Sequence, residues 1–148
     1  LVKINKNLID IYTACNPLKL MADADLYKSL KSPLAVPESL LSESLKKKFK
    51  NVKLLDFGVG IKENSFEFHE SGALLPRLYS LTYALSIATT GNASRILLAG
   101  FDGYGSNDKR TKIVDELFFL YSTCKKAKQV TAITPTSYSV TSASIYTL

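Results

Sequence analysis

An apolar run that leads into a glycine-rich turn constrains the fold of this chain more than any other feature. The run lies within the predicted strand at residues 95–101, directly after Arg95; the turn lies at residues 100–105, and a helical pattern follows. An unbroken apolar stretch of this length is typical of a strand buried on both faces of a parallel sheet. In such sheets, ligands bind just beyond the carboxyl ends of the strands. The turn is therefore the first place to look for a functional site.

Strand-like and helix-like segments alternate along the chain. Strands are expected at residues 8–14, 52–60, 95–101 and 129–134, at 33–37 between two prolines, and as a short extra edge strand at 144–148. Helices are expected near 38–50, 74–88 and 108–126, with a shorter one from Asp23 or Asp25 to Leu30, and Gly91-Asn92 is expected to end the helix near 74–88. This alternation predicts right-handed βαβ units and an α/β fold, specifically a three-layer Rossmann-like sandwich with a mostly parallel sheet. The 148 residues fit one such domain. Residues 62–72 show no periodicity and are predicted to form a loop.

The charge and the cysteines narrow the choice of partners. The net charge of +6 comes largely from lysines near residues 46–53 and 125–128, where helices are expected to end. Cations there complement the negative end of the helix dipole, and no nucleic-acid recognition motif accompanies them. No apolar stretch approaches the ~20 residues that cross a bilayer. Cys15 and Cys124 form no CxxC pair, as expected of reduced thiols in a cytoplasmic protein.

The start of the chain suggests a larger protein. The sequence begins at Leu1 rather than at a methionine, and no secretion signal follows. We expect residues 1–148 to be the C-terminal part of a longer polypeptide, with another domain upstream.

The turn and the loop after the next strand supply the candidate binding residues. Glycines allow a ligand close to the backbone, and the following helix offers free N–H groups to an anion. Asp102 would repel a phosphate, but it suits sugar hydroxyls or a metal. Arg110 can hold a carboxylate or phosphate with two N–H groups. The predicted ligand-binding set is Gly100, Asp102, Gly103, Tyr104, Arg110, Thr134, Thr136 and Tyr138.

Simpler readings of these residues remain open. The turn can be a tight βα connection with a structural aspartate, and Arg110 can be a solvated residue beside an aspartate cap. The hydroxyl-rich segment after residue 133 can likewise be a solvated loop.

Catalytic candidates are few. His69 is the single histidine, and it lies between Glu67 and Glu70 in the predicted loop. Such neighbours suit a general acid or base, so His69 and Asp102 are the weak catalytic candidates, although one histidine in a loop is more often incidental. One histidine and two separated cysteines build no zinc site. No metal ligands are therefore predicted.

Residues 83–105, with Asp108, Arg110 and residues 133–138, resemble the C-terminal domain of a group of bacterial aldolase-like proteins. Those proteins carry an N-terminal barrel similar to HMG-CoA lyase and 4-hydroxy-2-oxovalerate aldolase, and they occur with surface-polysaccharide synthesis. The C-terminal domain is also similar in pattern to Rossmann-like domains of bacterial sialyltransferases. The resemblance is strongest over residues 74–146.

The resemblance implies a domain of an aldolase or lyase of carbohydrate metabolism that itself binds a sugar-phosphate or nucleotide-sugar. It implies no cofactor within this domain and a divalent metal in the upstream barrel, so no aldolase residue carries over to this sequence. One alternative is a glycosyltransferase that uses a nucleotide-activated acidic sugar. The other is a non-catalytic scaffold that assembles a homo-oligomer.

Overall fold

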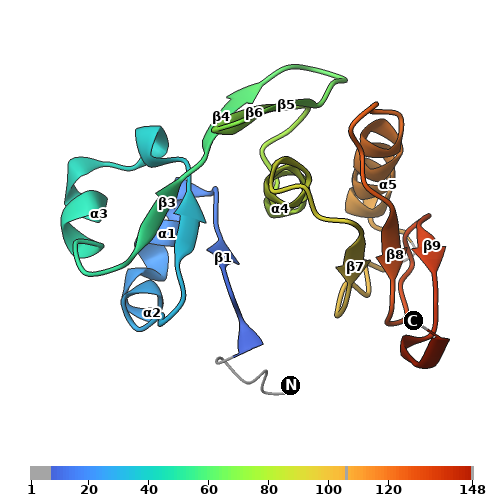
Figure 1. Cartoon of the computed structure of the whole chain (residues 1–148), viewed down its shortest axis with the longest axis horizontal. Helices are drawn as coiled ribbons and strands as arrows, with labels where there is room; N and C mark the ends of the chain where they lie inside the picture. The colour runs from blue at the N-terminus through green and yellow to red at the C-terminus, as the bar shows by residue number, and fades with distance from the viewer. Residues whose placement is uncertain (1–7, 106, 148) are drawn as a thin grey trace.

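The computed structural model describes residues 8–105 and 107–147. Helices and mostly parallel strands alternate, so the chain has a mixed α/β fold (Figure 1). The strands of the described residues are divided among three three-stranded sheets, with the orders β1-β2-β3, β4-β6-β5 and β7-β8-β9. The single continuous sheet expected of a Rossmann-like sandwich is not formed among them.

The first sheet is parallel throughout, and short helices connect its strands. Asn16 caps the first helix, because its side chain accepts the N–H groups of Leu18 and Lys19 at 3.0 and 3.2 Å. The long helix expected near residues 38–50 is divided, because the Ser42 hydroxyl caps a new helix by accepting the Leu45 N–H. These elements are β1 (Tyr12–Thr13), α1 (Pro17–Ala22), α2 (Ala24–Lys28), β2 (Leu34–Val36), η2 (Glu38–Leu40), α3 (Glu43–Lys48) and β3 (Leu54–Asp56).

A small mixed sheet occupies the region that the sequence assigned to one long strand and a loop. The expected strand at residues 52–60 is broken at Phe57, so β3 and β4 belong to different sheets. β4 pairs in parallel with β6, and β5 pairs with β6 in antiparallel. Within the predicted loop at residues 62–72, residues 67–69 are thus an edge strand, and Gly72 begins another strand. The elements are β4 (Gly58–Ile61), β5 (Glu67–His69) and β6 (Gly72–Leu75).

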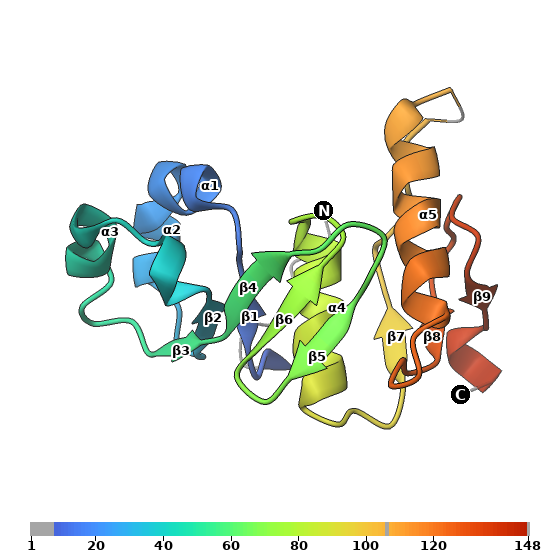
Figure 2. The same ribbon diagram turned by 90° about the horizontal axis from the view of Figure 1, so that it is seen from above.

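Helix α4 (Ser80–Thr90) lies in the middle of the molecule, between the first sheet and the third (Figures 1 and 2). It begins six residues later than the apolar spacing predicted, because Leu74 belongs to β6 and pairs with Gly60. Its end agrees with the prediction: Gly91 is the C-cap, and Asn92 has a positive φ of 55°. The eleven residues of α4 include no charged side chain, as is typical of a helix that is covered on all sides.

The third sheet follows the predicted βαβ pattern. β7 and β8 are parallel, and the connecting helix α5 is capped by Asp108, whose carboxylate accepts the Arg110 N–H. The expected edge strand at residues 144–148 is wrong: the strand forms earlier, as β9, and a short helix follows. Leu148 lies outside the described residues. The elements are β7 (Ile96–Leu98), α5 (Lys109–Ser122), β8 (Val130–Ala132), β9 (Thr141–Ser142) and η3 (Ile145–Thr147).

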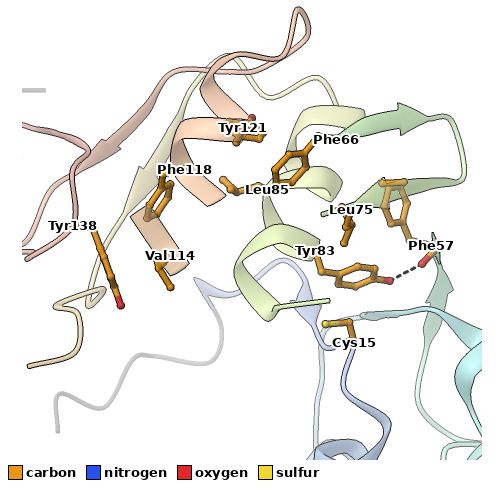
Figure 3. Close-up of a cluster of buried hydrophobic side chains, with 11 residues drawn as sticks. Cys15, Phe57, Phe66, Leu75, Tyr83, Leu85, Val114, Phe118, Tyr121 and Tyr138 are labelled. Atoms are coloured by element: carbon orange, nitrogen blue, oxygen red, sulfur yellow. Dashed lines mark hydrogen bonds between the residues drawn. The ribbon is translucent and has the colours of Figure 1, made fainter. Parts of the chain in front are cut away.

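Two clusters of buried side chains stabilise the molecule. The N-terminal core lies between the first sheet and helices α1–α3, and it consists of Ala14, Leu20, Ala24, Leu34, Val36, Leu41, Leu45 and Phe49. The C-terminal core surrounds α4 and α5 (Figure 3). In it the buried Tyr83 hydroxyl donates to the Phe57 carbonyl at 2.7 Å. Its other members are Cys15, Phe66, Ala73, Leu75, Leu85, Val114, Phe118, Tyr121 and Tyr138.

Candidate functional site

The loops after β7 and β8 leave the third sheet at the same edge. Ile96 pairs with Val130 and Leu98 with Ala132 in parallel register, so both strands end side by side. This places residues 99–105 next to residues 133–140. The juxtaposition agrees with the sequence-based expectation that the candidate residues of the two segments lie at one sheet edge.

Three hydrogen bonds hold the two loops together. The Gly100 N–H donates to the Thr134 hydroxyl at 2.9 Å. The Thr136 hydroxyl donates to the Phe101 carbonyl at 2.7 Å. The Ser137 N–H donates to the Asp102 carbonyl at 2.9 Å. The loops therefore form one unit, and Thr134 and Thr136 use their hydroxyls to build it.

A solvent-open hollow of about 310 Å³ lies on this unit. Asp102, Gly103 and Tyr104 are exposed along it, and the carboxylate of Asp102 makes no ion pair among the described residues. Within the same part of the chain, no acceptor is recorded for the N–H groups of Asp102 and Gly103. The hollow therefore presents both a hydrogen-bond acceptor, the Asp102 carboxylate, and hydrogen-bond donors, the N–H groups of Asp102 and Gly103. The hollow is lined by Gly100, Phe101, Asp102, Gly103, Tyr104 and Tyr138.

The floor of the hollow is aromatic. Tyr138 is only 7% exposed, and its ring lies 5.3 Å from that of Phe101 and 5.9 Å from that of Phe118. Burial raises the pKa of the Tyr138 phenol, so it remains a neutral hydroxyl. Because this ring belongs to the C-terminal core, the hollow has a fixed base.

A positive charge stands beside the hollow. The guanidinium of Arg110 lies 3.9 Å from the centre of the Tyr104 ring, within cation–π range. It also forms an ion pair with Asp108 at 2.5 Å. The side-chain hydrogen bond from Arg110 lowers the pKa of Asp108 to about 2. Asp108 therefore partly neutralises the cation that the site offers.

The structure brings together most of the predicted binding residues but separates the two catalytic candidates. Gly100, Asp102, Gly103, Tyr104 and Tyr138 line the hollow, and Arg110 contacts it through Tyr104. His69 lies elsewhere, at the end of β5, in a second hollow between β5, the end of α4 and the segment after α5.

Two contributors were missed by the sequence analysis. Phe101 lines the hollow, although it was not among the predicted ligand-binding residues. Asp115 accepts the Ser139 N–H at 2.7 Å and so ties the loop after β8 to α5. No local signal marks Asp115, because its partner is distant in sequence.

Comparison of the chain with family models, with curated proteins and with solved structures gives no match. Among the described helices, none has the length and apolar composition that crossing a membrane requires. In that same part of the chain, His, Cys, Asp and Glu side chains form no group of three or more that could hold a metal ion. The site itself is therefore the basis for a functional proposal.

Proposed function

We propose that this chain is a Rossmann-like domain that binds a sugar-phosphate, or the sugar-phosphate end of a nucleotide-sugar, as the C-terminal part of an aldolase-like enzyme of carbohydrate metabolism. One observation carries the proposal: an exposed carboxylate, unpaired backbone N–H groups, an aromatic floor and an arginine meet at the carboxyl edge of parallel strands. Ligands of α/β proteins bind at this place in the fold.

The two parallel sheets support the Rossmann-like part of the proposal. β1-β2-β3 and β7-β8-β9 run outward in opposite directions from the region under α4 (Figure 1). The classic doubly wound order 3-2-1-4-5-6 has the same two halves.

Each group has a role suited to a hydroxylated anion. The Asp102 carboxylate can accept hydrogen bonds from two sugar hydroxyls, and the free N–H groups of the loop can donate to a phosphate. Arg110 can add a two-pronged contact once it is released from Asp108. Drug-sized ligands occupy pockets of about 300–1,000 Å³, so a hollow of about 310 Å³ accommodates a single sugar-phosphate unit.

The proposal assigns binding, and not bond cleavage, to these residues. A glycosyltransferase needs an acid or base near the reacting sugar, and His69 lines a different hollow from Asp102. For an aldolase, the divalent metal and the base belong to the upstream barrel in this proposal.

Isothermal titration calorimetry with a panel of hexose phosphates and nucleotide-sugars tests this function. Arg110→Ala should weaken binding of a hexose phosphate by roughly 10–150-fold, because a charged hydrogen bond contributes about 1.5–3 kcal/mol. The matched control is Lys109→Ala, which removes the same charge one residue away and should change affinity less than about twofold.

Asp108→Asn sharpens the test. Asparagine is as good a helix N-cap as aspartate, so α5 keeps its start while Arg110 loses its competing ion pair. Affinity for the phosphate should therefore rise. No heat with any member of the panel, or equal losses from Arg110→Ala and Lys109→Ala, would overturn the proposal and favour an assembly scaffold.

A further inference from the structure

Four lysines line a hollow of about 340 Å³ beside the amino end of β3. They come from three segments of the chain: the end of α2, the last turn of α3 and the turn that follows α3. This hollow shares no residue with the one on the loops after β7 and β8, so its charge is not part of the proposed sugar-phosphate site. Its lining residues are Lys28, Lys47, Lys48, Lys50, Asn51 and Val52.

An aromatic pair holds the three segments together. The rings of Tyr27 and Phe49 meet edge to face, with their centres 6.1 Å apart. Phe49 is buried in the N-terminal core, and Tyr27 packs against the same core. Lys28 directly follows Tyr27 in the chain, and Lys48 and Lys50 stand on either side of Phe49. The backbone that carries the lysines is therefore fixed by packing.

Helix dipoles account for only part of this arrangement. Lysines in the last turn complement the negative end of a helix, which suits residues 46–48 on α3 and Lys28 on α2. Lys50 belongs to neither helix. The dipoles explain cations at each helix end, but they do not explain why two helix ends and a further lysine meet at one hollow. Like charges repel each other there, and an anion between them relieves that repulsion.

The charge of the hollow is largely uncompensated. Asp25 pairs with Lys28 at 2.7 Å, and the hydrogen bond from Lys28 lowers the pKa of Asp25, with a smaller contribution from the charge of Lys48. Lys47, Lys48 and Lys50 make no ion pair among the described residues. Four lysines and one aspartate thus leave a charge of +3. A hollow lined by one sign of charge concentrates ligands of the opposite sign.

The lining favours a short chain of phosphate groups over a nucleic acid. An ammonium group is a compact charge with three donors, so separate lysines can engage oxygens spaced along such a chain. Asn51 adds a backbone N–H that has no acceptor among residues 8–105 and 107–147. Single-stranded nucleic acids bind where bases stack on aromatic rings, and none of the described lining residues is aromatic.

We propose that this hollow binds a compact anion with two or more linked phosphate groups, such as inorganic pyrophosphate or tripolyphosphate. The ammonium groups of Lys47, Lys48 and Lys50 engage oxygens of different phosphates, and the Asn51 N–H donates to one of them. The site is separate from the sugar-phosphate hollow, and neither proposal depends on the other.

Isothermal titration calorimetry at about 150 mM salt, without divalent cations, tests the site. The protein carries Arg110→Ala, so that the other proposed phosphate site does not contribute. Tripolyphosphate should bind at least about tenfold more tightly than orthophosphate, because a single phosphate group cannot engage lysines on three segments at once. Affinity for uridine triphosphate equal to that for tripolyphosphate assigns the site to the phosphate chain alone, and a higher affinity assigns it to a nucleotide.

Three consecutive lysines on α3 provide matched variants. Glutamine has a helix propensity close to that of lysine, so the helix is kept. Lys47→Gln and Lys48→Gln should each weaken tripolyphosphate binding by about fivefold or more. Lys46 is the control, because it pairs with Glu43 at 3.0 Å and does not line the hollow. Lys46→Gln should change the affinity by less than about twofold.

Two further measurements locate the site. Asp25→Asn removes the carboxylate that competes for Lys28, so affinity for tripolyphosphate should rise. In amide NMR spectra, tripolyphosphate should shift the Asn51 signal and leave that of Gly103 unchanged. The proposal fails if tripolyphosphate gives no heat or if Lys46→Gln weakens binding as much as Lys47→Gln. It also fails if oligothymidine or phosphatidylserine vesicles bind more tightly than tripolyphosphate, because the lysines would then form a surface for nucleic acid or membrane.

Discussion

Alanine substitutions at the three glycines of the loop after β7 test how the candidate site is built. Gly103 has a φ of 104°, and a Cβ added there would lie 1.9 Å from the Ser137 Oγ. Gly100 has a φ of 67°, but no described atom lies within 4 Å of its added Cβ. Gly105 has neither constraint among the described residues. The series therefore separates backbone strain from steric clash within one loop.

The expected losses in the free energy of unfolding differ between the three positions. A left-handed backbone costs an L residue about 1–2 kcal/mol, which is the loss expected for Gly100→Ala. Gly103→Ala adds overpacking against Ser137, about 1–3 kcal/mol, for a total of roughly 2–5 kcal/mol. For a chain of this size, that corresponds to a Tm lower by roughly 4–20 °C. Gly105→Ala should be neutral, or stabilising by up to about 1 kcal/mol, because alanine restricts the unfolded chain.

Urea unfolding followed by circular dichroism measures these differences. The double variant Gly103→Ala/Ser137→Gly, compared with Ser137→Gly alone, should recover the overpacking part, about 1–3 kcal/mol. A Gly103→Ala variant as stable as Gly105→Ala would refute the reasoning. So would a double-mutant cycle with no recovery, because the two loops would then not be in the contact described.

Three further outcomes are expected. The pKa of Asp108 is lowered to about 2, so its contribution to stability is present above about pH 4 and is lost as the pH falls toward 2. In the Asp108→Asn variant, the urea midpoint should therefore change less between about pH 4 and pH 2 than in the unmodified protein. Tyr83→Phe removes the only hydrogen-bond donor to the Phe57 carbonyl among the described residues. It should lower the free energy of unfolding, measured with heat or urea, by about 1–3 kcal/mol. A loss below about 0.5 kcal/mol, roughly the spread of surface substitutions, would contradict this. Burial raises the pKa of both thiols, and Cys124 is the less buried, so a thiol reagent at pH 8 should label Cys124 before Cys15, and both slowly.

The sequence predicted correctly those elements that begin or end at a proline or at a helix-capping residue. β2 was placed by its flanking prolines, Pro33 and Pro37, and α5 by its cap at Asp108. The start of α4 was wrong, because Leu74 continues the helical spacing by coincidence. Its pairing with Gly60 in β6 is a contact between segments that local spacing does not reveal.

The candidate site was predictable in place but not in detail. Parallel strands bring Asp102 and Tyr138 to one edge, and the sequence anticipated both. It did not anticipate that the hydroxyls of Thr134 and Thr136 bond to the facing loop. Which partner a hydroxyl selects depends on the distance between loops, and that distance is set by tertiary packing. For the same reason the sequence could not show that Asp108 engages Arg110.

The two cores divide the chain almost without interleaving along the sequence. The N-terminal core draws only on residues 14–49, and the C-terminal core on residues 57–138 together with Cys15. Contiguous segments with separate cores tend to open as separate cooperative units. We therefore expect a calorimetric enthalpy of unfolding that exceeds the van't Hoff value, as in proteins with a populated intermediate. Cys15, carried by the N-terminal segment but buried in the other core, is one residue through which melting of one unit reaches the other. The Phe57 N–H, which donates to the Val36 carbonyl at 3.0 Å, is a second link between the units.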